Sequence, residues 1–336
     1  MDLETFLTVL YVCVDDWYKA EGIHLMQRHA GAGVQMSDSE VLTVALAGRW
    51  QVGVPWRSER GVVRYMLAHG RQWFPTMLQR SAFNRRVRHI WGCFVRLQQV
   101  VAQWLETPDT AYECVDCMPL AACSLAQAAR GEGHWLWWSA LGHGGNWGGW
   151  TFGEQVLLAV HQHQAITGWL IGPASADDRW MMQALVSARR GAMCLQPPPP
   201  AQRGRRHVSP APQGQILPTI AANVGHPRPY LADRGFNGAR WQRHWRQWQA
   251  VVISQPPDNA PEHWPDSLKH EVRSRRQIVE TVFAQLTQVM GLNRLQAHSR
   301  WGQLTRIAAT CAAYNFGIWF NRLLQRPDGA LATLIC

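Results

Sequence analysis

The sequence has almost no lysine and few charged residues of any kind. Lys19 and Lys269 are its only lysines among 33 basic residues, and charged residues make up 17% of the chain, against about a quarter in typical soluble proteins. Acidic residues number 23, so the formal net charge is +10. This balance favours an anionic partner, and the planar fork of arginine suits phosphates and guanine edges. A genome rich in arginine codons would also explain the scarcity of lysine.

Long hydrophobic runs and paired cysteines are missing as well. Met1–Glu4 is acidic, and two aspartates directly follow the apolar run Phe6–Val14, so no secretory signal is predicted. The most apolar late segment, Ile307–Leu324, is interrupted by two asparagines and an arginine, which makes it a poor membrane span. The eight cysteines show no spacing typical of secreted disulfide-rich domains. We therefore expect a cytoplasmic protein with reduced thiols and no membrane partner.

The first part of the chain, residues 1–108, is predicted to be mostly helical. Ser37-Asp38-Ser39-Glu40 has the spacing of a capping box before an apolar run. Another helix is predicted to start at Ser81, with a basic outer surface formed by Arg85, Arg86, Arg88 and His89. Two capped helices with a basic second helix resemble a helix-turn-helix, although the spacing is long. An ordinary helical bundle with a solvated arginine face explains the pattern equally well.

Residues 109–336 change to a pattern of strands and helices. The predicted strands are 112–118, 154–161, 166–172, 230–232 and 250–254, and the predicted helices are 177–190, 238–248, 269–290 and 302–324. Residues 196–229 form a proline-rich, basic insertion that we expect to be a loop or disordered. The order is strand, hairpin, helix, strand, helix, strand, helix. That is the order of an RNase H-like core, an α/β fold with a mixed sheet flanked by helices.

Three acidic residues fall at places that such a core brings together. Asp116 lies in an apolar strand, Asp233 ends another strand, and Glu280 lies within a helix. An acid in an apolar strand is costly unless it is bound or paired. Each residue also has an ordinary explanation, since Asp233 could cap a turn and Glu280 could pair with Arg276. Together, three carboxylates suit Mg²⁺ or Mn²⁺, and two ions about 3.5–4 Å apart would activate a hydroxyl and stabilise a leaving oxygen.

With these residues in view, the chain resembles a DDE transposase of a bacterial insertion sequence. The matching stretches are Val115–Pro119, Leu231–Phe236 and Arg276–Leu286, with further likeness at Met36–Val41, Arg80–Arg88 and Ala176–Arg179. The resemblance covers most of residues 36–325. It implies a DNA-binding region in 1–108 and an RNase H-like catalytic domain in 109–336. It also implies that Asp116, Asp233 and Glu280 bind two Mg²⁺ or Mn²⁺ ions. Water would then cut the element's end, and the freed 3′-hydroxyl would attack target DNA.

The expected partner is double-stranded DNA, both the element ends and the target, in a nucleoid-associated protein. The arginines predicted to contact the duplex are Arg80, Arg85, Arg86 and Arg88, and those predicted to hold phosphates near the metals are Arg273 and Arg276. Because two ends must be paired, a homodimer is compatible with this function. The helix motif departs from related transposases, since Arg273 replaces a frequent tyrosine and Thr287 a frequent lysine. Thr287 supplies no cation, which would weaken end-binding or activity.

Other interpretations of the sequence remain open. Cys114-x-x-Cys117 has zinc-ligand spacing and is followed by Cys123 and His134, but a structural site usually needs two paired sets of ligands. The pair His161 and His163 could also bind a metal. A catalytically inactive or domesticated DNA-binding derivative would retain binding without cleavage. A metal-dependent nuclease of the same fold would need no specific ends.

Overall fold

In a computed structural model of the chain, two compact units are present. The structure describes residues 1–25, 35–130, 139–143, 149–190, 228–257, 259, 263–295, 297 and 299–336. One unit comprises Met1–Glu106 together with Ala284–Cys336, and the other comprises Thr107–Phe283. The proline-rich insertion predicted at 196–229 lies outside the described residues except at its last two positions.

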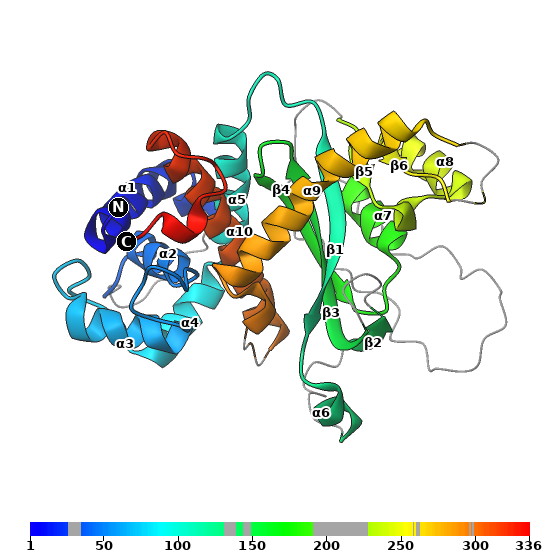
Figure 1. Cartoon of the computed structure of the whole chain (residues 1–336). Coiled ribbons are helices and arrows are strands. Elements are labelled where there is room, and N and C mark those ends of the chain that lie inside the picture. The colour runs from blue at the N-terminus through cyan, green and yellow to red at the C-terminus, as the bar shows by residue number, and fades with distance from the viewer. Residues whose placement is uncertain are drawn as a thin grey trace. The chain divides into compact units, whose positions relative to one another are not determined.

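The first unit is helical, as predicted for residues 1–108 (Figure 1). Its helices are α1 (Leu3–Ala20), α2 (Asp38–Ala47), α3 (Glu59–His69), α4 (Arg80–His89), α5 (Trp91–Trp104) and α10 (Arg300–Leu323), with short 3-10 turns at Gly22–Leu25, Leu292–Arg294 and Leu331–Thr333. The capping box predicted at the start of α2 is formed, since Glu40 N donates to Ser37 Oγ and Ser37 N donates to the Glu40 carboxylate. The helix α4 begins one residue before the predicted Ser81.

The C-terminal helix belongs to this first unit. α10 is buried along most of its length and packs on α5, α2 and α4. Phe6 of α1 contacts both Trp50 and Phe320 through aromatic rings. The compact units therefore do not coincide with a boundary at residue 108, because apolar residues of α10 need the N-terminal helices to cover them. The functional division into a DNA-binding region and a catalytic domain stays a prediction.

The second unit contains a mixed sheet. Within the described residues its strands are β1 (Glu113–Ala121), β2 (Ala140–His143), β3 (Trp150–His161), β4 (Ile166–Pro173), β5 (Tyr230–Ala232) and β6 (Val252–Ser254). β3 pairs antiparallel with β1, β2 and β4, whereas β5 pairs parallel with β1 and β6. The central strand β1 thus joins the antiparallel part of the sheet to the parallel part.

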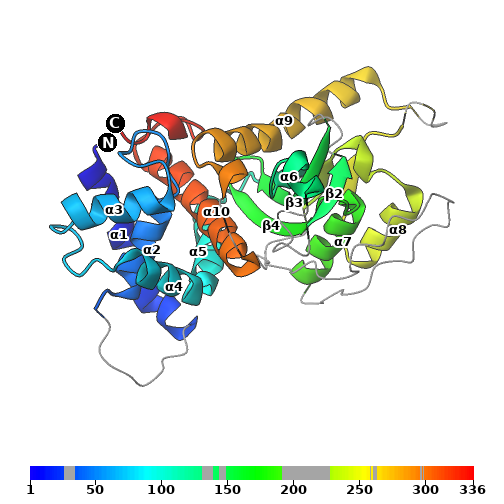
Figure 2. The ribbon, with the colours of Figure 1, turned by 90° about the horizontal axis from the view of Figure 1, so that it is seen from below.

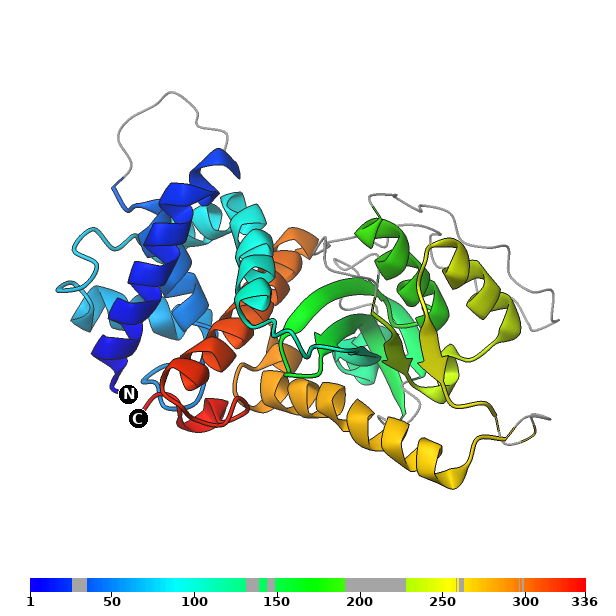
Figure 3. The ribbon, with the colours of Figure 1, turned by 90° about the horizontal axis from the view of Figure 1, so that it is seen from above.

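Helices cover both faces of this sheet. They are α7 (Asp178–Arg189), α8 (Ala239–Gln247) and α9 (Asp266–Gln288), and the unit also contains the short helix α6 (Leu125–Ala129) and a 3-10 turn at Arg234–Phe236. Figures 2 and 3 show α7 and α8 side by side on one face and α9 along the other. The five predicted strands and the helices α7, α8, α9 and α10 are all present, within a few residues of the predicted ends.

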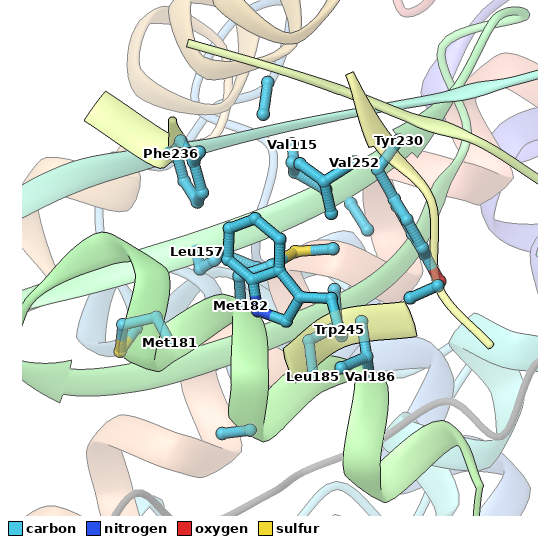
Figure 4. Packing of buried hydrophobic residues seen from close by; sticks show 14 of the residues in the cluster. Val115, Leu157, Met181, Met182, Leu185, Val186, Tyr230, Phe236, Trp245 and Val252 are labelled. Carbon is cyan, nitrogen blue, oxygen red and sulfur yellow. The ribbon is translucent and has the colours of Figure 1, made fainter. Parts of the chain in front are cut away.

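The main core of the second unit lies between the sheet and the pair α7 and α8. Figure 4 shows the Trp245 indole among Met182, Leu185 and Val186, with Val115 of β1 also in the cluster. Trp245 is fully buried. This packing fixes α7 and α8 to the sheet at the end where Asp233 follows β5.

Two elements of this unit were not predicted, the strand β2 and the short helix α6. β2 has only four residues, Ala-Leu-Gly-His, and it is held in place by its antiparallel pairing with β3. Such a segment has too few alternating positions to be recognised from the sequence. In the described part of the chain, no helix combines the length and the apolar character needed to cross a membrane.

Candidate active site

The three predicted acids come from three different elements of the second unit. Asp116 is the fourth residue of β1, Asp233 directly follows β5, and Glu280 lies on α9. The parallel register pairs Val115 with Ala232, so the next position along both strands places Asp116 beside Asp233. As expected from strand alternation, Cys114 and Asp116 contact α9, and Glu113 and Cys117 contact α7.

All three acids line one cavity of about 760 Å³. Its other charged lining residues are Asp177, Asp178, Arg179, Arg273 and Arg276. Asp116 is the most buried of the three predicted acids, with a side chain 17% exposed against 42% for Asp233, while Glu280 is exposed on its helix. The structure therefore brings the predicted carboxylates and both predicted phosphate-holding arginines to the same cavity.

Arg276 lies between two of the carboxylates. Its Nη2 is 3.3 Å from Asp116 Oδ2, and its Nη1 is 3.4 Å from Asp233 Oδ1. These distances exceed the usual 2.7–2.9 Å of a tight guanidinium–carboxylate pair, and the buried Arg276 Nε has no hydrogen-bond partner among the described residues. A loosely held cation therefore occupies the space between Asp116 and Asp233.

Burial raises the pKa of Asp116 to about 6, from an ordinary value of 3.8. Arg276 and the backbone N–H of Cys117 oppose this rise, whereas Asp233 and Asp178 add to it. Because the folded pKa is the higher one, the folded chain binds this proton more readily than the unfolded chain. The contribution of Asp116 to stability thus falls as pH rises from about 4 to 6. At neutral pH the site carries a costly negative charge that a bound cation would offset.

The two other acids have different local surroundings. Asp233 Oδ1 accepts a hydrogen bond from Arg234 N at 2.7 Å and caps the turn that follows. The structural role that the sequence also allowed for Asp233, as a turn cap, is therefore present. Glu280 lies one helical turn after Arg276 but forms no hydrogen bond or ion pair with any residue that the structure describes. The Glu280 carboxylate is therefore available to a ligand in the cavity.

Asp178 is a cavity residue to which the sequence analysis gave no role. It starts α7, and its carboxylate lies close to the side chains of Cys117 and Gln155. Burial raises the pKa of Asp178, and Asp177 and Asp233 add to this rise. The signal in the sequence was the pair of aspartates directly after the hairpin, which was noted as family-like. The placement of Asp178 beside β1 requires the fold.

The oxygen-rich lining fits hard divalent cations, because carboxylates are their preferred protein ligands. The arrangement of Arg276 between Asp116 and Asp233 shows that these carboxylates accommodate a positive charge. Among the described residues, however, no three His, Cys, Asp or Glu side chains are close enough together to hold a metal ion without rearrangement. Arg276 occupies that position instead.

Of the residues of the alternative zinc site, Cys114 and Cys117 lie in β1, and His134 lies outside the described residues. Cys114 Sγ contacts the carbonyl of Arg275 on α9, whereas Cys117 contacts Asp178 on α7. The two thiols thus face opposite sides of β1. Burial also raises the pKa of both thiols, to about 12 for Cys114, which disfavours the thiolate that binds zinc.

The predicted DNA-contacting arginines lie on α4 in the first unit. Arg80 and Arg85 are exposed, and Arg88 is partly exposed. Arg86 differs, since it forms an ion pair with Asp38 and donates to the carbonyl of Met36 at 3.2 Å. Asp38 also accepts a hydrogen bond from Tyr18. Arg86 therefore links α4 to α2, and its role in DNA binding stays a prediction.

The sheet order β4-β3-β1-β5-β6, with acids on β1, after β5 and on α9, defines an RNase H-like fold. A family model described as a transposase DDE domain matches residues 128–316, which is more than half of the chain. The protein therefore belongs to the family of transposases with a DDE domain, as its sequence indicated. The matched residues include Asp233 and Glu280 and begin after Asp116. No curated protein and no solved structure matches the chain.

Proposed function

We propose that the protein is a DNA transposase that cleaves DNA at the ends of its own insertion element and joins the cut strand to target DNA. The observation that carries this proposal is the convergence of Asp116, Asp233 and Glu280 on one cavity that also contains Arg273 and Arg276. Two bound Mg²⁺ or Mn²⁺ ions would supply the activation of the attacking hydroxyl and the charge that stabilises the leaving oxygen.

The chain's own residues bind and orient the reactants. Asp116, Asp233 and Glu280 would hold the two ions, which requires Arg276 to leave the space between the aspartates. Arg276 would then turn its guanidinium toward a non-bridging phosphate oxygen, where its planar fork suits two hydrogen bonds. Arg273, one turn earlier on α9 and also in the cavity, would hold a neighbouring phosphate.

The test is cleavage of DNA taken from the flanks of the gene, in the presence of Mg²⁺, Mn²⁺, Ca²⁺ or EDTA. The expected result is discrete cuts and joined products with Mg²⁺ or Mn²⁺ only. Cuts spread over any duplex would favour a nuclease of the same fold. Specific binding without any cut would favour an inactive or domesticated derivative. Failure to bind or cut any duplex would contradict all three.

The same proposal sets the expected location and assembly. A protein that acts on chromosomal DNA would be nucleoid-associated in the cytoplasm, and pairing of two element ends would suit a homodimer. Analytical ultracentrifugation with and without an end-containing duplex measures this. A single protein chain on two joined ends would contradict the dimer.

Replacing Arg276 by glutamine is expected to strengthen Mn²⁺ binding several-fold in the absence of DNA. The substitution removes the cation that competes for Asp116 and Asp233 and leaves two carboxylates facing each other. The thermal stabilisation by Mn²⁺, measured by calorimetry, should therefore be larger than in the wild type. Cleavage should fall, since the phosphate contact is lost.

The matched control for this substitution is Arg275→Gln. Arg275 is adjacent on α9, but it pairs with Glu271 and does not line the cavity. Its replacement should change neither Mn²⁺ affinity nor cleavage appreciably, since exposed ion pairs of this kind contribute about 1 kcal/mol or less. Equal Mn²⁺ affinity in wild type and Arg276→Gln would mean that the guanidinium does not compete with the metal.

Two neighbouring arginines of α4 are expected to respond differently to alanine. Arg86→Ala removes the half-buried pair with Asp38 and should lower the free energy of unfolding by about 1–3 kcal/mol. Arg85→Ala should leave stability unchanged and reduce the salt dependence of DNA binding by roughly one phosphate contact. Urea unfolding and binding titrations in 50–200 mM KCl measure the two effects. Unchanged stability of Arg86→Ala would mean that the ion pair contributes nothing.

A further inference from the structure

The outer face of α8 is an unusually uniform basic surface. Arg240, Arg243 and Arg246 are exposed and recur every three residues, which places them along one side of the helix. The sequence Ala-Arg-Trp-Gln-Arg-His-Trp-Arg-Gln contains no acidic residue. We call these three arginines the α8 arginine stripe.

The inner face of α8 fixes the direction of the stripe. Trp245 is fully buried (Figure 4), and Trp241 and Trp248 pack against the same core. Gln242 Nε2 donates to the carbonyl of Val252 on β6 at 2.8 Å. Because these contacts leave the helix little freedom to rotate, the arginines must point away from the sheet. Figures 2 and 3 show α8 beside α7, on the face of the sheet opposite α9.

Among the described residues, the acids near the stripe are paired with other cations. On α9, Lys269 pairs with Asp266 and Arg275 pairs with Glu271, and before α7 Asp177 pairs with Arg179. In the part of the chain that the structure describes, no ion pair is formed by any arginine of the stripe. Like charges three residues apart destabilise a helix. This arrangement is therefore unfavourable for the free protein, and an extended polyanion would relieve it.

The stripe begins next to the proposed active site. The turn Arg234–Gly238 joins Asp233 directly to α8. Arg179, which lines the cavity, lies over the Trp241 ring at 6.0 Å from its centroid. At the other end of the helix, the exposed Arg190 donates to the carbonyl of Trp248 at 3.3 Å. Arg179 and Arg190 thus lie on the side of α8 that bears the tryptophans, and the cavity, which is also lined by Gly235, lies next to the end of α8 where the stripe begins.

We propose that the α8 arginine stripe binds the sugar–phosphate backbone of the DNA duplex that adjoins the strand in the cavity. This inference rests on the proposed function. Helical rise separates the first and last arginine by about 9 Å, which corresponds to two or three base steps of about 3.4 Å along a duplex. The contacts are to phosphates, so they add affinity and fix orientation without sequence preference.

The experiment compares the full chain with Arg240→Gln/Arg243→Gln/Arg246→Gln. Binding of a 30-bp random duplex and of a duplex from the gene's flanks is measured by fluorescence anisotropy between about 50 and 200 mM KCl, the range over which phosphate contacts change affinity strongly. The plot of log affinity against log salt should become shallower by up to about 2.7, or about 0.9 for each lost contact. The decrease should be the same for both duplexes.

Two control variants separate a site from a general effect of charge. Lysines at the same three positions keep a positive charge for phosphate and should retain the salt dependence. Arg275→Gln/Arg294→Gln removes two exposed positive charges outside residues 1–108 and outside the cavity lining, and should change the salt dependence less per charge than the α8 glutamines do. Circular dichroism checks that all variants are folded, which is expected because the changed side chains are exposed.

The outcomes distinguish this inference from the proposed function. If the wild type binds and cuts the flanking duplex but DNA binding by the α8 glutamine variant keeps the wild-type salt dependence, only the proposal about the stripe is wrong. An equal loss per charge in the Arg275→Gln/Arg294→Gln control would also overturn the proposal about the stripe, because the loss would then reflect total charge. If the wild type binds neither duplex, the proposed function and the stripe fail together.

Discussion

We expect the rate of DNA cleavage to fall on the order of a thousandfold or more in each of the variants Asp116→Asn, Asp233→Asn and Glu280→Gln. Metal ions stabilise a transition state by several kcal/mol, and each 1.36 kcal/mol is a factor of ten in rate. The amides keep nearly the same shape but lose the charge that would hold the cations. Single-turnover cleavage of the flanking duplex with Mg²⁺ is the measurement, with duplex binding followed in parallel.

The matched control is Asp177→Asn. Asp177 lines the same cavity, but its carboxylate pairs with Arg179 and caps α7, and asparagine is an equally good cap. The cleavage rate of the Asp177→Asn variant should fall by less than about tenfold, which corresponds to 1.36 kcal/mol of activation free energy. Full cleavage by any one of the three acid variants would place the metal site elsewhere. A loss of duplex binding in all three would mean that the carboxylates act through structure and not through chemistry.

The strands that carry the acids were readable from the sequence because their patterns are local. Strand alternation alone requires Cys114 and Asp116 to share one face of β1, and both contact α9. The spacing from Arg276 to Glu280 likewise predicted their neighbouring positions on α9. Short-range periodicity was thus sufficient to predict the strands and the helix that carry the acids, and their order along the chain.

The position of Arg276 between Asp116 and Asp233 could not be predicted in the same way. These residues are separated by 160 and 43 positions in the chain, and only the packing of α9 on the sheet brings them together. The sequence predicted that Arg276 holds a phosphate near the metals, whereas in the structure its guanidinium contacts the carboxylates of Asp116 and Asp233. The grouping of α10 with the N-terminal helices depends on long-range burial for the same reason.

Loss of Glu113 is expected to destabilise the second unit by about 3–5 kcal/mol, because it leaves a buried arginine unpaired. Arg189 Nη1 donates to Glu113 Oε2 at 2.5 Å and to the Tyr230 hydroxyl at 2.7 Å, and Nη2 donates to Thr167 at 2.9 Å. The side chains of Arg189 and Glu113 are only 7% and 2% exposed. Burial by itself lowers the pKa of Arg189, but Glu113 and Tyr230 raise it above its ordinary value.

Urea unfolding of Glu113→Ala, Arg189→Met and the double variant Glu113→Leu/Arg189→Met measures this. The free energy of unfolding should decrease less in the double variant than in either single variant, since the double variant leaves no uncompensated charge. Arg179→Met, on the same helix, breaks an exposed pair and should cost about 1 kcal/mol or less. A similarly small loss for Glu113→Ala would contradict the prediction. Because Arg189 joins α7 to β1, β4 and β5, and two of these strands position Asp116 and Asp233, the single variants should also lose cleavage near their unfolding midpoint.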